Sequence, residues 1–101
     1  MASRIIWSRS ATVDKVRILN YWIKKTGSKT YARKLNDSLV EAVKLLKDFP
    51  NLGRNVPGTE YQFIVKDHYQ IFYKHLKEKR EIRILHVWDS RRNPDCLNLN
   101  E

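Results

Sequence analysis

The sequence is poor in residues that cross-link, coordinate metals or break regular structure. Among its 101 residues there are one cysteine (Cys96), three glycines and three prolines. A single cysteine excludes an internal disulfide and a zinc site built on paired cysteines. The three histidines (His68, His75 and His86) show no spacing typical of metal ligands. We therefore expect no bound metal.

Signatures of nucleotide-binding and hydrolytic enzymes are also missing. The chain has no phosphate-binding loop, no dinucleotide-binding glycine pattern, and no zinc-protease or nucleophile-elbow motif, so we expect no cofactor. No Pro-, Gly- or Ser-rich linker divides it. No apolar run approaches the roughly 20 residues of a membrane span. We expect one domain over residues 1–101, located in the cytoplasm, with no membrane partner.

Acidic residues are few compared with basic ones. Lys and Arg number 20 against 11 Asp and Glu, which gives a net charge of +9. Such an excess attracts polyanions and accelerates their encounter with the protein. Nucleic acid, a ribosome surface, an anionic membrane and an acidic protein are all partners of suitable charge.

Two segments have the periodicity of helices. In the first, Ser10 is the expected N-cap, an apolar stripe runs from Ile18 to Ile23, and Thr26-Gly27 ends the helix. In the second, Ser28 is the expected cap and Pro50 the stop. This second helix has an apolar residue at alternating spacings of three and four, namely Ala32, Leu35, Leu39, Ala42, Leu46 and Phe49. The short connection predicts an antiparallel helical hairpin.

Four segments have strand character. They are 4–8, 61–66, 69–75 and 81–88, the last three separated by short polar turns. The last is apolar on both faces, which indicates a central place in the sheet. The order β-α-α-β-β-β predicts an α+β fold, with the helical hairpin on one face of a mostly antiparallel four-stranded sheet. We expect function on the uncovered face.

Cationic side chains are frequent in the second half of the chain. Lys66 and Lys74 flank a predicted hairpin turn, Arg83 is on the last strand, and Arg91 and Arg92 follow it. Neighbouring strands bring side chains within about 5 Å, so several of these cations could converge on one face. Such a cluster can hold a phosphate backbone. With a proton acceptor and donor, it can also stabilise the anion formed when an RNA 2′-hydroxyl attacks its phosphodiester, without a metal.

The sequence resembles the RelE/ParE superfamily of toxins from bacterial type II toxin–antitoxin modules. The similarity runs from about Arg4 to Pro94. It rests on Ile5-Ile6-Trp7, Tyr21-Trp22, Tyr31-Ala32, Leu45-Leu46, Phe49 to Arg54, Tyr69 to Tyr73, and Ile82 to Pro94. The resemblance implies a small basic toxin held inactive by a cognate antitoxin, which we expect to be acidic where it covers the toxin.

The resemblance leaves two activities open. RelE-like members cut mRNA in the ribosomal A site, whereas ParE-like members inhibit DNA gyrase and are not nucleases. The partner is accordingly either the ribosome with its mRNA or gyrase. A third interpretation, from another class, is an inactive relative that only binds an antitoxin or nucleic acid.

The catalytic positions of the ribonucleases correspond only partly to this sequence. Arg91 or Arg92 matches a catalytic-type position, and Arg54 and Lys66 are weaker correspondences. No Tyr or His follows Arg92, where the ribonucleases usually carry one, so Tyr73 or His86 would have to serve the proton transfers. Lys66, Lys74, Arg83, Arg91 and Arg92 are the expected nucleic-acid contacts.

Overall fold

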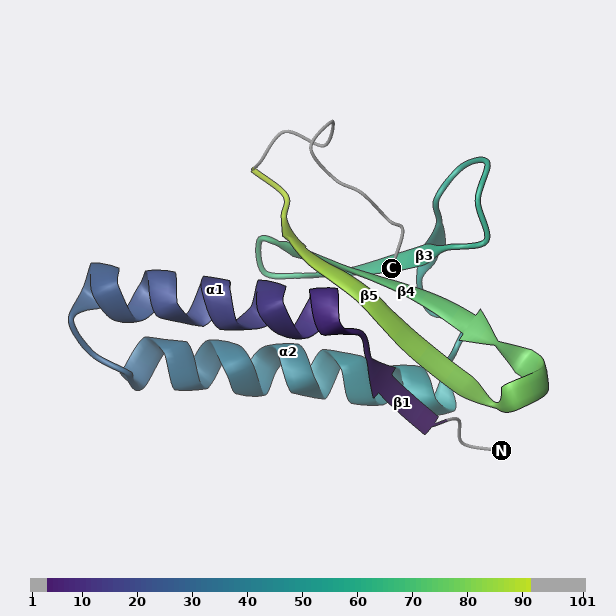
Figure 1. Ribbon diagram of the computed structural model, residues 1–101, viewed down its shortest axis with the longest axis horizontal. Helices are drawn as coiled ribbons and strands as arrows, with labels where there is room; N and C mark the ends of the chain where they lie inside the picture. Colours follow the sequence, from purple (N-terminus) through teal and green to yellow (C-terminus); the bar gives the residue numbers. More distant parts are fainter. Residues whose placement is uncertain (1–3, 92–101) are drawn as a thin grey trace.

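The computed structural model describes residues 4–91, which fold as two helices packed on one face of a sheet (Figure 1). The α+β class is therefore confirmed. In chain order the elements are β1 (Arg4–Trp7), α1 (Arg9–Thr26), α2 (Thr30–Asp48), β2 (Arg54–Asn55), β3 (Gln62–Lys66), β4 (Tyr69–Leu76), the short 3-10 helix η1 (Lys77–Lys79) and β5 (Glu81–Asp89).

The helical hairpin forms as expected, but α1 begins earlier than predicted. Ser8 is the N-cap instead of Ser10, and its Oγ accepts a hydrogen bond from the Ala11 amide at 3.0 Å. The reason is that β1 runs directly into the helix, so Ser8 is the last extended residue before the chain turns. α1 ends at Gly27, whose φ of 72° lies in the left-handed region that glycine adopts readily.

α2 follows the predicted periodicity from Ala32 to Leu46, but Phe49, the last residue of the predicted seam, lies beyond the helix and is exposed. Lys29 occupies its cap position without a side-chain hydrogen bond, although Ser28 Oγ accepts one from the Thr30 amide at 3.1 Å. The helix ends just before Pro50, because the residue preceding proline disfavours the helical conformation. Its buried residues are Ala32, Leu35, Leu39, Ala42, Val43 and Leu46.

The sheet has five strands in the order β1-β5-β4-β3-β2, one more than predicted. The additional strand, β2, contributes only Arg54 and Asn55, which pair with Phe63 and Gln62. Two residues are too few to show a strand pattern in sequence. β5 lies between β1 and β4, so its predicted central place is confirmed. β1 pairs with it in parallel, while the other pairings are antiparallel.

The core lies between the helices and one face of the sheet. Ile71 pairs with Val87, and Tyr73 with Ile84, and all four side chains are buried against the helical hairpin. Residues of the opposite parity, such as Lys74 and its partner Arg83, are therefore on the face that the helices leave uncovered, where Phe72 and Trp88 are nonetheless buried. Figure 1 shows that the hairpin extends well beyond the edge of the sheet, with the α1–α2 connection at its far end.

Tyr73 connects the core to the loop that follows α2. Its hydroxyl donates to the Pro50 carbonyl at 2.8 Å and accepts from the Gly53 amide at 2.9 Å. The side chain is fully buried, and this burial raises the pKa of Tyr73 above its ordinary value of 10. Gly53 is required here, because an added Cβ would lie 2.6 Å from the Tyr73 hydroxyl.

We expect Tyr73→Phe to lower the free energy of unfolding by about 1–3 kcal/mol, because two buried backbone groups lose their partner. Stability of the unmodified chain should fall above pH 10, where the unfolded tyrosine ionises and the folded one does not. Urea unfolding at pH 8 and at pH 10.5 measures both effects. The cost of the substitution should be smaller at the higher pH. Tyr21→Phe, at an exposed position, is the control and should change neither value.

Candidate functional site

The uncovered sheet face brings together two of the predicted cations, each already paired with a carboxylate. Lys74 and Arg83 are directly opposite on β4 and β5. Lys74 Nζ lies 3.1 Å from Glu60 Oε2, and Arg83 Nη2 lies 3.1 Å from Glu81 Oε2. Glu81 is buried and also binds Arg4 at 3.3 Å. The positive potential of this pair is thus largely offset by the adjacent carboxylates.

Arg54 and Lys66 lie apart from that pair. Arg54 is opposite Phe63 at the far edge of the sheet, on β2. Lys66 is opposite Tyr69, which belongs to the core, so the side chain of Lys66 is on the helix-covered face of the sheet. Both side chains are exposed and line one groove between α2 and β3. The register therefore separates cations that the sequence suggests could converge.

Arg91 follows β5 and forms a bidentate ion pair with Asp89. Its Nη2 lies 2.8 Å from Asp89 Oδ2 and its Nε lies 3.0 Å from Oδ1. Hydrogen bonding to Arg91 lowers the pKa of Asp89, and the same contact raises the pKa of Arg91. Arg91 lines a hollow of about 390 Å³ with Tyr21 of α1, on the helix side of the sheet. Arg92 lies outside the described residues.

The two predicted proton carriers are both inaccessible. Tyr73 is fully buried and its hydroxyl is occupied by Pro50 and Gly53. The Nε2 atom of His86 is buried and has no hydrogen-bond partner among the described residues. Neither group can touch a phosphodiester in this conformation.

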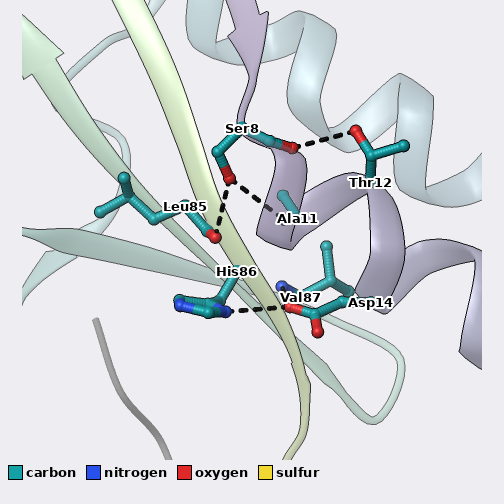
Figure 2. A network of polar contacts seen from close by, with 7 residues as sticks. All are labelled: Ser8, Ala11, Thr12, Asp14, Leu85, His86 and Val87. Atoms are coloured by element: carbon teal, nitrogen blue, oxygen red, sulfur yellow. Dashed lines mark hydrogen bonds and ion pairs between the residues drawn. The ribbon is translucent and has the colours of Figure 1, made fainter. Parts of the chain in front are cut away.

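His86 belongs to a polar junction between β5 and the start of α1 (Figure 2). Its Nδ1 lies 3.0 Å from Asp14 Oδ2, and the same oxygen accepts from the Val87 amide at 3.1 Å. A carboxylate only accepts, so Nδ1 carries a proton. Ser8 Oγ donates to the Leu85 carbonyl at 3.0 Å. The junction therefore joins the first two turns of α1 to one short stretch of β5.

Asp14 would complement the helix dipole if α1 began at Ser10, but the structure gives it another role. Because α1 begins at Arg9, Asp14 lies in the second turn and reaches across to the backbone of β5. β1 pairs with β5 only as far as Ile84, so the Val87 amide beyond it can bind Asp14, which no periodic pattern in the sequence reveals. Sequence reasoning missed this residue as a partner of His86.

An apolar groove of about 790 Å³ separates α2 from β3. Three of its large apolar residues are more than half exposed, Leu45 at 52%, Leu52 at 54% and Val65 at 60%. β2 pairs only with Gln62 and Phe63, so along Ile64 to Lys66 the outer edge of β3 has no strand neighbour among the described residues. Exposed apolar residues beside an open strand edge are typical of a surface that binds another chain.

Residues 4–91 show neither a metal centre nor a membrane span. No group of three metal-binding side chains occurs within that range. None of the helices there is long and apolar enough to cross a membrane.

The comparisons with known proteins agree with this architecture. A family model described as the ParE toxin of the type II toxin–antitoxin system parDE matches residues 5–94. The chain is similar to a structure of the chromosomal ParDE system from P. aeruginosa, with 23% identity and a TM-score of 0.73 over 85% of this chain and 94% of that one. It is also similar to the RelBE2 toxin–antitoxin complex from Mycobacterium tuberculosis, with 16% identity and a TM-score of 0.63 over 86% and 96%. A comparison with curated proteins gave no match.

Removal of the Asp14 carboxylate should weaken the junction. We expect Asp14→Ala to lower the free energy of unfolding by about 1–3 kcal/mol, because the Val87 amide loses its acceptor in a partly buried place. Urea denaturation measures the change. Asp37→Ala, at an exposed site on α2, is the matched control and should cost little. Equal losses in the two variants would contradict a structural role for the junction.

Proposed function

The chain belongs to the ParE toxin family of type II toxin–antitoxin systems, and from this premise we propose that it arrests growth by inhibiting DNA gyrase. The proposal rests on one observation above all. Among residues 4–91, the side chains expected to carry ribonuclease chemistry are buried, paired or dispersed, so a non-nucleolytic action accounts better for the arrangement.

The requirements of RNA cleavage explain why this observation supports the gyrase proposal. Cleavage through a 2′-hydroxyl needs a proton acceptor, a proton donor and a cation, all within hydrogen-bond reach of one phosphate. Tyr73 and the Nε2 atom of His86 are shielded, and Arg91 is held by Asp89. Inhibition of a large enzyme by surface contact requires none of these groups to be free.

Purified protein added to gyrase and relaxed plasmid should block the introduction of supercoils, with no codon-specific cuts when it is added to translating ribosomes. Gel electrophoresis of the plasmid and primer extension on the mRNA measure the two outcomes. The toxin bound to its antitoxin is the matched control and should leave gyrase active.

Ribosome-dependent mRNA cleavage is the second candidate, and the Asp14–His86 pair favours it. A histidine oriented by a carboxylate is a familiar proton acceptor once its second nitrogen is uncovered. Codon-specific cuts that disappear in His86→Gln, with supercoiling unaffected, would establish this activity and overturn the gyrase proposal. Absence of both activities, with harmless expression, would leave a module that only binds its antitoxin or nucleic acid.

The groove between α2 and β3 is our proposed docking place for the antitoxin. Two solved structures similar to this chain are toxin–antitoxin systems, which supports an antitoxin partner. Leu45 and Val65 would bury apolar surface on binding, and Arg54 and Lys66 at the rim favour an acidic segment. The open edge of β3 offers backbone hydrogen bonds to an extended stretch of the partner.

Leu45→Lys should weaken antitoxin binding by about tenfold or more, because it removes about 1.5–3 kcal/mol of apolar burial and adds a charge to the groove. Isothermal titration calorimetry with the cognate antitoxin measures the dissociation constant. Val16→Lys is the control, since Val16 is similarly exposed at 48% but lies on α1. Similar losses in both variants, or none in either, would place the antitoxin elsewhere.

A further inference from the structure

The positive charge of the chain is concentrated in the helical hairpin. Seven of the 20 Lys and Arg residues, and none of the 11 Asp and Glu residues, lie between Lys15 and Asn36. The remainder of the chain has 13 cations against 11 anions and is close to neutral. The net charge of +9 is therefore mainly a property of the two helices where they join, and not of the sheet.

The end of this hairpin, here called the basic tip, is the stretch from Lys24 to Lys34. All five of its cations are exposed, namely Lys24, Lys25, Lys29, Arg33 and Lys34. None of them takes part in the ion pairs found among residues 4–91, whereas Lys74, Arg83 and Arg91 all do. The basic tip thus presents unneutralised charge to solvent.

Helix electrostatics do not account for this arrangement. Lys24 and Lys25, in the last turn of α1, are placed favourably relative to the helix dipole. Lys29 and Arg33 are placed unfavourably, because they lie at the start of α2, where anions are preferred and the first turn has no acidic residue. A cost to local stability without a compensating contact is typical of a functional surface.

The basic tip also has shape and aromatic surface suited to a large partner. It projects beyond the sheet, so a bulky molecule can approach it without meeting the strands (Figure 1). Tyr31 within the tip and Tyr21 just before it are 41% and 53% exposed, and Lys25 Nζ lies 5.9 Å from the Tyr21 ring centroid. A cluster of cations on one exposed surface is typical of proteins that contact nucleic acid.

We propose that the basic tip binds the phosphate backbone of duplex DNA. Arg33 and Lys34 are about 100° apart around α2, so the cations face more than one direction. A single acidic helix would contact the cations on only one of these sides. Phosphates on both sides of a DNA groove, spaced densely along the duplex, would meet several. The inference rests on the proposed function only for the choice of duplex DNA, the nucleic acid on which gyrase acts.

The test uses the full chain and a fluorescently labelled duplex of 20 base pairs, without gyrase. Anisotropy titrations over a range of salt concentrations give the affinity and its salt dependence. In K25Q/K29Q/R33Q we expect at least about tenfold weaker binding at 0.1 M salt. The slope of log K against log salt should become shallower by about 0.9 for each phosphate that the variant no longer neutralises.

The matched control, K44Q/K47Q/K79Q, removes the same charge from exposed positions outside the basic tip. It should retain most of the affinity and slope, and circular dichroism should show both variants folded. The charge-preserving variant K25R/K29R should bind as the unmodified chain does.

Three results would overturn the inference. Equal weakening in the two neutralised variants would show that net charge acts without a defined surface. Tighter binding to single-stranded RNA of equal length would assign the basic tip to RNA, and displacement of DNA by poly-glutamate at equal charge would assign it to an acidic protein. Because the binding test contains no gyrase, a failure to bind DNA would leave the supercoiling result unaffected. If K25Q/K29Q/R33Q still inhibits gyrase while its DNA binding is weakened, the two proposals are distinguished.

Discussion

The junction between the start of α1 and the irregular part of β5 is the constraint on which the arrangement depends. β1 pairs with β5 in parallel, and a parallel partner must be reached by a crossover rather than a tight turn. The helical hairpin supplies much of that connection. Ser8 and Asp14 then fasten its first helix to Leu85 and Val87, next to the register shift between β4 and β5. These contacts at the N-terminal end of α1 fix the direction of the helix.

Because the hairpin is fixed to the sheet at one end, the apolar groove and the basic tip lie at different ends of the helices. Near the sheet, α2 packs through Leu39 and Leu46 and leaves the apolar groove beside β3. At the far end no strand covers the helices, so exposed lysines are not desolvated there (Figure 1). On the sheet, by contrast, carboxylates such as Glu81 and Asp89 lie beside the arginines. Charge is therefore neutralised where the fold is compact and remains unpaired where the hairpin projects.

Much of the fold could be predicted from the sequence, because its signals are local. The spacing of Leu35, Leu39 and Leu46 predicts α2, and the two apolar faces of β5 predict its central place. The site could not be predicted in the same way, since the location of each cation depends on strand register. The register of β3 and β4 puts the side chains of Lys66 and Lys74 on opposite faces of the sheet, and the contact of Asp14 depends on where β1 stops pairing with β5.

The geometry of α2 determines how the two proposed surfaces relate. Leu45 and Lys29 are 16 positions apart, which corresponds to about 24 Å along a helix. An antitoxin segment confined to the groove at Leu45 would thus leave the basic tip uncovered. Under the proposed function, neutralisation would then act by blocking contact with gyrase rather than contact with DNA. A toxin held in this way would retain its attraction for DNA while inactive, so release from the antitoxin would occur close to the substrate of its target.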